Sequence, residues 1–88
     1  MDTSTETIKI YGTTWCGDCR RAKAFFDKNQ IPYAWIDIDR DPAARQLVEQ
    51  LNHGNRSVPT ILFPDGSILV EPRESQLVAK FGIQTPAP

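Results

Sequence analysis

The chain has 88 residues, which is enough for one small domain with a single hydrophobic core. It is 40% hydrophobic and 24% charged, and its net charge of -1 provides no electrostatic attraction to nucleic acid or acidic membranes. Residues 1–7 lack the basic and apolar stretches of a signal peptide, and no run approaches the roughly 18 apolar residues of a membrane span. We therefore expect a cytoplasmic protein that binds neither nucleic acid nor membranes.

A strand followed by a helix is predicted at the start of the chain. Residues 6–11 alternate in polarity and contain the β-branched and aromatic types that favour strands, and we expect Gly12 to end this strand. Residues 16–28 predict a helix, because their apolar side chains recur at helical spacing. The face that should enter the core consists of Cys19, Ala22, Phe25 and Phe26.

A second strand and a second helix follow. Residues 33–38 predict the strand. Asp41 can cap a helix and Pro42 suits its first turn, so we expect a helix that continues to about Leu51. Two strands separated by a helix indicate a parallel pair joined by a right-handed crossover.

The last third of the chain predicts a hairpin and a final helix. Residues 60–63 and 67–70 read as strands, and the turn residues Pro, Asp and Gly at 64–66 allow them to pair antiparallel. Residues 72–81 predict a helix that supplies apolar side chains to the core. We expect the tail at 84–88 to fray.

The chemistry of the chain is concentrated in its two cysteines, Cys16 and Cys19. A cysteine at the start of a helix lies near unpaired N–H groups and the positive end of the helix dipole, which favour the thiolate. Residues three apart share a helical face, so the second cysteine can attack a disulfide formed at the first. Two cysteines and one histidine fall short of the four ligands of a structural zinc site, so no metal site is expected.

The sequence resembles the thioredoxin superfamily, in particular its glutaredoxin-sized members, and among these the mycoredoxins. The resemblance rests on Thr-Thr-Trp-Cys-Gly-Asp-Cys at 13–19, Gly-Asn-Arg-Ser-Val-Pro-Thr at 54–60 and Asp-Gly-Ser at 65–67, together with the order of elements. It implies an α/β fold of the thioredoxin/glutaredoxin type, in which a four-stranded mixed sheet (βαβ then ββα) is flanked by three helices. We expect one glutaredoxin-like domain over 1–88, with an ordered core of about 6–82.

The resemblance also implies roles for individual residues. Cys16 would be the attacking thiolate and Cys19 the resolving cysteine. Pro59 would follow a cis peptide bond, and the backbone of Val58 would then pair with the substrate beside the nucleophile. The remaining candidate substrate-binding residues are Trp15, Thr14 and Arg56.

The activity expected from this resemblance is reduction of mixed disulfides between proteins and a small thiol. No tightly bound cofactor is expected; mycothiol or glutathione would serve as co-substrate. The partners would be disulfide-containing proteins, small thiols and a flavin disulfide reductase, and the protein would act as a monomer. Two alternatives remain open: a redoxin reduced by glutathione or by a thioredoxin reductase, and an iron–sulfur or metal carrier in which two chains each offer Cys16.

Overall fold

The computed structural model of the protein describes residues 7–83, so the fraying expected at 84–88 lies outside the described part. β1 (Ile8–Gly12) and β2 (Tyr33–Asp37) pair in parallel, and α1 (Gly17–Lys28) connects them. The crossover expected from the sequence is thereby confirmed. It carries the chain from the carboxyl end of β1 directly into the segment that contains both cysteines.

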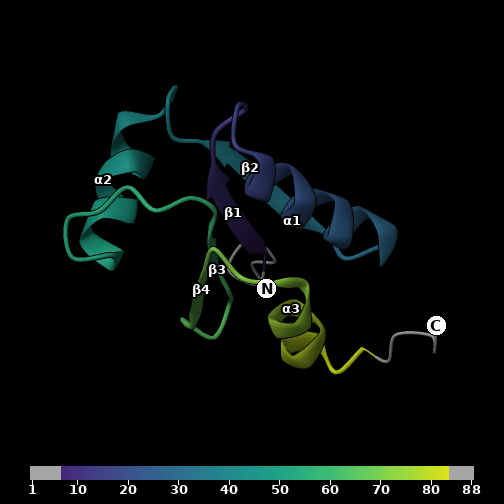
Figure 1. Cartoon of the computed structure of the whole chain (residues 1–88). Helices are drawn as coiled ribbons and strands as arrows, with labels where there is room; N and C mark the ends of the chain where they lie inside the picture. The colour runs from purple at the N-terminus through teal and green to yellow at the C-terminus, as the bar shows by residue number, and fades with distance from the viewer. Residues whose placement is uncertain (1–6, 84–88) are drawn as a thin grey trace.

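The second half of the chain completes the sheet. α2 (Pro42–Leu51) leads to β3 (Thr60–Leu62) and β4 (Ile68–Val70), and α3 (Glu74–Phe81) follows. β3 pairs antiparallel with both β1 and β4, which gives the strand order β2-β1-β3-β4 (Figure 1). The predicted four-stranded mixed sheet with three helices is confirmed. None of the helices found between residues 7 and 83 has the length and apolar character needed to cross a bilayer.

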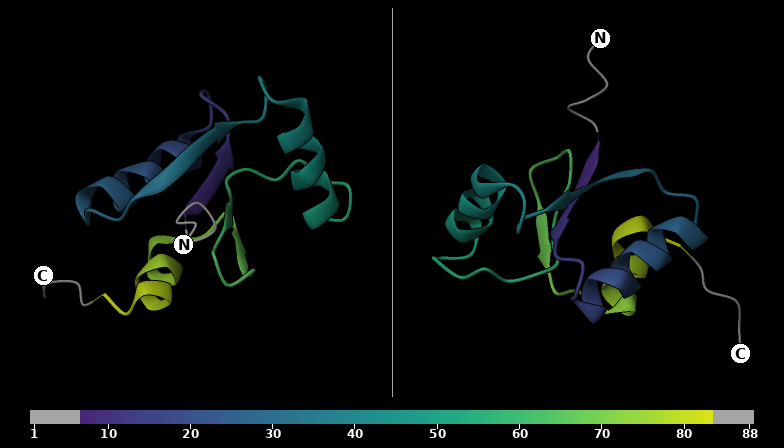
Figure 2. Two further views of the ribbon diagram at one scale, coloured as in Figure 1. Left: turned by 180° about the vertical axis from the view of Figure 1, so that it is seen from behind. Right: turned by 90° about the horizontal axis from the view of Figure 1, so that it is seen from above.

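The helices cover the sheet from two sides. α1 and α3 lie on one face and α2 lies on the other, as the view from above shows (Figure 2). The residues of β1 alternate between these faces, so that Ile10 packs toward α1 and α3 whereas Tyr11 packs toward α2. The larger core contains Ile10, Ala22, Phe25, Phe26, Ile61, Phe63 and Leu77, and the smaller one Tyr11, Ile38, Ala44 and Val48.

The sequence predicted a strand over residues 6–11 with Gly12 as the break after it, whereas β1 includes Gly12. It is the last residue of the strand and pairs with Asp37 of β2. A Cβ atom at this position would lie 2.6 Å from Cys19 Sγ and 2.7 Å from the Trp35 ring. Gly12 is therefore needed for close packing against the second cysteine rather than for a turn.

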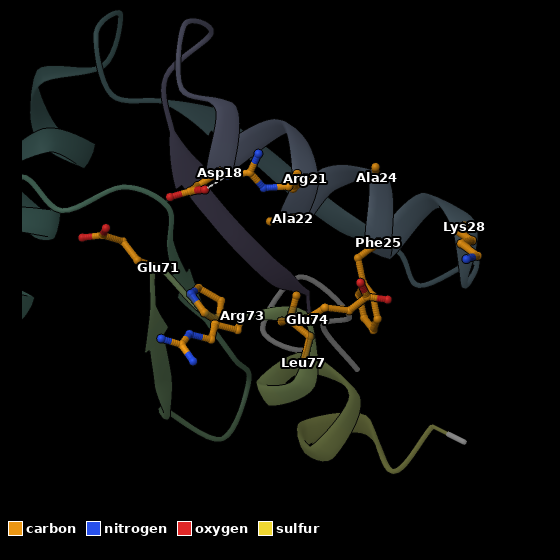
Figure 3. Close-up of a pocket in the computed structure, with 11 residues that line it drawn as sticks. Asp18, Arg21, Ala22, Ala24, Phe25, Lys28, Glu71, Arg73, Glu74 and Leu77 are labelled. Atoms are coloured by element: carbon orange, nitrogen blue, oxygen red, sulfur yellow. Dashed lines mark hydrogen bonds and ion pairs between the residues drawn. The ribbon is translucent and has the colours of Figure 1, made fainter. Parts of the chain in front are cut away.

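α3 begins at Glu74, two residues later than the sequence predicted. Glu71 has a positive φ of 48°, which ends the extended path of β4, and Arg73 becomes the N-cap residue. The Arg73 amide donates a hydrogen bond to Gln76 Oε1 at 2.8 Å, so the side chain of the third helical residue satisfies it. Pro72 thus belongs to the connecting segment, which lines a groove of about 640 Å³ between this segment and α1 (Figure 3).

Candidate functional site

Cys16 is the N-cap residue of α1 and lies between the end of β1 and the first helical turn. Its backbone is extended, with φ of -86° and ψ of 119°, and its Sγ accepts a hydrogen bond from the Cys19 amide at 3.1 Å. This is the contact that a capping side chain makes with the third helical residue. A sulfur in this position faces the positive end of the helix, and Cys16 as a whole is buried, with 9% of its surface exposed.

Cys19 lies one turn further along α1 and is completely buried. Burial raises the pKa of the Cys19 thiol to about 12, and its hydrogen bond with Cys16 adds to the effect. Cys19 therefore keeps its proton at neutral pH. The two cysteines occupy different environments: Cys16 caps the helix and keeps 9% of its surface exposed, whereas Cys19 is fully enclosed.

The segment just before β3, although distant in the sequence, lies next to Cys16. The Val58 carbonyl oxygen lies 3.8 Å from Cys16 Sγ, within range of a weak hydrogen bond from the thiol. The Val58–Pro59 peptide bond is cis, as the resemblance implied. Pro59 is held in turn by Glu71, whose amide donates to the Pro59 carbonyl at 2.8 Å. Two stretches of chain separated by 42 residues thus come together at one sulfur.

Trp15 precedes the first cysteine and is 69% exposed, a large fraction for an indole. Its Nε1 donates a hydrogen bond to Asp39 Oδ2 at 3.0 Å. Asp39 belongs to the turn after β2, and its own amide donates to Asp37 Oδ1 at 2.9 Å. Asp39 is not among the site residues predicted from the sequence. A signal was available, because β1 and β2 are parallel and the residues that follow them must meet at one edge of the sheet.

Thr14 and Arg56 lie less directly at the cysteines. Thr14 is exposed in the turn that leads into Trp15. Arg56 Nε donates to Glu49 Oε2 of α2 at 2.7 Å, and no hydrogen bond links Arg56 to Cys16 among the residues described. In the same part of the chain, no three His, Cys, Asp or Glu side chains gather as a metal site would require.

Residues 8–68 match the glutaredoxin family model. The chain belongs to the glutaredoxin family. A Mycobacterium tuberculosis relative named "putative glutaredoxin" is 43% identical over 76 residues, which cover 86% of this chain and 90% of the relative. Mycoredoxin 1 of Corynebacterium glutamicum is 37% identical over 73 residues, which cover 83% of this chain and 90% of that protein.

Solved structures agree with this assignment. The crystal structure of a thioredoxin-like protein matches with a TM-score of 0.73 and 26% identity, over 83% of this chain and 97% of that one. A glutaredoxin from Archaeoglobus fulgidus matches with a TM-score of 0.69 over 90% of this chain and 92% of its own, and at 20% identity it supports the fold alone. The thioredoxin/glutaredoxin fold is therefore confirmed.

Membership of the glutaredoxin family gives the cysteine pair its chemical context. The family indicates thiol oxidoreductase activity, and this chain is a glutaredoxin-like redox protein with a Cys-x-x-Cys pair. The Cys16 sulfur accepts a hydrogen bond from a backbone amide at the helix start, and Cys19 is the more deeply buried of the two and protonated. Such an asymmetric pair suits stepwise thiol–disulfide exchange better than simultaneous reaction of both thiols.

Proposed function

We propose that this protein reduces mixed disulfides between proteins and a small thiol of the mycothiol type, with Cys16 as the attacking nucleophile. The observation that carries the proposal is the position of Cys16 as the N-cap of α1, where its sulfur accepts the Cys19 amide hydrogen at 3.1 Å. A helix start favours negative charge on a capping group, and the thiolate is the reactive form of cysteine. Cys19, buried beneath it, cannot be reached first.

The first half of the proposed reaction transfers the small thiol to the enzyme. The Cys16 thiolate attacks the small-thiol sulfur of a protein–S–S–R disulfide, the Cys16–S–S–R bond forms, and the protein sulfur leaves as a thiolate that takes up a proton. A second small thiol then attacks the R sulfur of the adduct, which releases R–S–S–R and restores Cys16. The net reaction consumes one free small thiol and converts protein–S–S–R and RSH into protein–SH and R–S–S–R. No step of this route needs Cys19.

Cys19 provides a second route for releasing the adduct. Once it has lost its proton, its thiolate attacks Cys16 Sγ, the intramolecular disulfide forms, and the small thiol leaves as RS⁻. The two residues are three apart on α1 and already in hydrogen-bonding contact, so little movement is required. Because its pKa is raised, Cys19 stays protonated at neutral pH, and Cys16 is therefore the residue that starts the cycle.

The substrate would bind across the surface around Cys16. The Val58 backbone next to Pro59 would pair with the extended chain that carries the substrate sulfur, as its carbonyl lies 3.8 Å from Cys16 Sγ. Trp15 would cover the incoming group with its exposed ring. Thr14 and Arg56 would contact more distant parts of the substrate. The proposal assigns no tightly bound cofactor.

The choice of mycothiol over glutathione is supported by the relative named Mycoredoxin 1, which is 37% identical. A flavin disulfide reductase would return the oxidised small thiol to its reduced form. The proposal places the protein in the cytoplasm, acting as a monomer on disulfide-containing proteins.

The decisive experiment compares turnover of one protein mixed disulfide with three reducing systems: mycothiol, glutathione, and thioredoxin reductase with NADPH. We expect turnover with mycothiol to exceed that with the other two, and we expect Cys16→Ser to abolish it. Turnover by thioredoxin reductase alone would replace the proposal with a thioredoxin-like redoxin. Visible absorbance in a preparation without turnover would favour an iron–sulfur carrier.

A further inference from the structure

The segment between α2 and β3 carries Val58 to the cysteine site, and two side chains hold this segment in place (Figure 1). Asn52, the C-cap residue of α2, donates from Nδ2 to the Val48 carbonyl at 2.9 Å and to Thr60 Oγ1 at 3.1 Å. Thr60 begins β3 and is completely buried, and its Oγ1 donates to the Ser57 carbonyl at 2.7 Å. Three hydrogen bonds thus link the end of α2 to the residue that precedes Val58.

The direction of each hydrogen bond in this chain is determined. The Val48 carbonyl can only accept, so it fixes which side of the Asn52 amide carries the nitrogen. That nitrogen can only donate, so Thr60 Oγ1 accepts from it. The single hydrogen of the Thr60 hydroxyl is then left for the Ser57 carbonyl. Asn52 therefore sets the rotation of the Thr60 hydroxyl.

The Thr60 hydroxyl in turn fixes the orientation of the Ser57–Val58 peptide group. This peptide bond is trans, so its C=O and its N–H point in opposite directions. The Ser57 carbonyl points inward to the buried hydroxyl, and the Val58 N–H consequently points away from it. Within residues 7–83, no acceptor forms a hydrogen bond with this N–H.

The Val58 N–H faces the side on which the reacting sulfur lies. Proline restricts the residue before it to extended conformations, and an extended residue directs its own N–H and C=O to the same side. The Val58 carbonyl oxygen lies 3.8 Å from Cys16 Sγ. Val58 therefore presents a donor and an acceptor together beside Cys16, and the donor has no partner in the part of the chain that is described.

A second C-cap asparagine shows what is particular to Asn52. Asn29 ends α1, and its Nδ2 donates to the Phe25 carbonyl at 2.8 Å, the same contact four residues back that Asn52 makes with Val48. Among the described residues, the Asn29 side chain has no second partner. Helix capping therefore accounts for one hydrogen bond of Asn52, and the bond to Thr60 is additional.

We propose that Asn52 and Thr60 are positioning residues for the substrate, which aim the Val58 N–H at the backbone of an extended polypeptide whose sulfur reacts with Cys16. The inference rests on the proposed function, because it concerns the chain that carries the substrate sulfur. A backbone carbonyl of that chain accepts the Val58 hydrogen, as in the addition of a strand. A disulfide without a polypeptide backbone gains nothing from this donor.

The test compares a disulfide that has a polypeptide backbone with one that lacks it. The first is the symmetrical disulfide of an acetylated and amidated five-residue peptide with a central cysteine, and the second is bis(2-hydroxyethyl) disulfide. In a Cys19→Ser background, the Cys16 thiolate attacks one sulfur, Cys16–S–S–R forms, and the other half leaves as RS⁻ and takes up a proton. Intact-protein mass spectrometry gives both rate constants. Their ratio, peptide over hydroxyethyl, cancels changes in the reactivity of Cys16 itself.

Four variants separate positioning from stability. Thr60→Val keeps the shape of the side chain and removes the hydroxyl, so the ratio should fall about three- to tenfold, as loss of one hydrogen bond predicts. Asn52→Ala leaves the hydroxyl free to rotate, and the ratio should fall about twofold. Thr60→Ser keeps the hydroxyl, and Asn29→Ala removes only a cap bond, so both should keep the ratio of the parent. Urea unfolding shows that each variant is folded.

An unchanged ratio in Thr60→Val or in Asn52→Ala would overturn the inference. So would a fall in Thr60→Ser as large as that in Thr60→Val, or a fall in Asn29→Ala as large as that in Asn52→Ala. If Thr60→Val does not fold, the comparison of Asn52→Ala with Asn29→Ala decides. Failure of Cys16 in the Cys19→Ser parent to react with either disulfide would instead overturn the proposed function.

Discussion

Trp15 Nε1 donates a hydrogen bond to Asp39 Oδ2 at 3.0 Å, although the Trp15 side chain is 69% exposed. An exposed indole would otherwise sample several rotamers, so this bond holds the ring in one orientation beside Cys16. The bond joins the segment after β1 to the turn after β2, and the parallel pairing of these strands makes it possible. The orientation of the aromatic ring next to the candidate nucleophile thus depends on a residue 24 positions away.

The Asp39→Ala variant should release the Trp15 ring. We expect faster decay of Trp15 fluorescence anisotropy in a Trp35→Phe background, since the chain has two tryptophans. Turnover of a mixed disulfide should fall about two- to tenfold in kcat/KM, mainly through KM, as loss of one hydrogen bond predicts. Asp39→Asn keeps an acceptor oxygen, so its anisotropy decay and its kcat/KM should both lie close to those of the unmodified protein. Equal losses in the two variants would show that the hydrogen bond is not the cause.

Cys19 should make the stability of the reduced protein fall at high pH. Its pKa is raised in the folded state to about 12, from about 8.5 in an unfolded chain, so the folded protein holds this proton more tightly between these values. The free energy of unfolding should be unaffected by this group below about pH 8.5 and should then fall by up to about 1.4 kcal/mol per pH unit. Urea unfolding from pH 7 to 10.5 measures the slope. Cys19→Ser should show a shallower decline, and identical slopes would contradict the assignment.

The buried hydroxyl of Thr13 should be dispensable for stability. Thr13 is 2% exposed, and its Oγ1 has no hydrogen-bond partner among the residues described. Thr13→Val keeps the shape and removes an unsatisfied polar group, so the free energy of unfolding should rise by about 1 kcal/mol. Thr60→Val is the matched control, because Thr60 Oγ1 donates to the Ser57 carbonyl at 2.7 Å and accepts from Asn52 at 3.1 Å. The control should lose about 1–3 kcal/mol. A comparable loss at Thr13 would mean that its hydroxyl has a partner.

The Cys19→Ser variant should separate the two routes of adduct release. It should still remove a small-thiol adduct from a protein in the presence of that thiol, because this route uses Cys16 alone. With a protein that carries an internal disulfide, and without a small thiol, it should stop at the mixed disulfide between Cys16 and that protein, since the intramolecular step is lost. Gel analysis of trapped covalent complexes distinguishes these outcomes. Absence of both activities would make Cys19 essential for the first step as well.

The sequence predicted the features that depend on neighbouring residues. The apolar stripe of α1 was assigned from helical spacing, and all four of its members are buried: Cys19, Ala22, Phe25 and Phe26. The start of α2 was equally clear, because Asp41 accepts a hydrogen bond from the Ala44 amide and Pro42 fills the first helical position. These preferences depend on residues within one or two helical turns of each other, so a short stretch of sequence is enough to predict them.

The features that were missed depend on distant contacts. The role of Gly12 follows from the approach of Cys19 and Trp35, which local preference for a turn does not reveal. The hydrogen bond to Asp39 and the groove bordered by Glu71 arise only when the sheet brings separate segments together. The cis peptide bond before Pro59 and the fold were predicted from the family resemblance, because residue spacing alone does not determine them.

The most direct test of the central claim is to identify which cysteine reacts first. The reduced protein is treated with a limiting amount of iodoacetamide at pH 7, and the tryptic peptide of residues 10–20, which contains both cysteines, is fragmented to locate the label. The account predicts that the label is on Cys16 and that it forms faster than on free cysteine. Labelling of Cys19 first, or a Cys16 rate no faster than that of free cysteine, would contradict it.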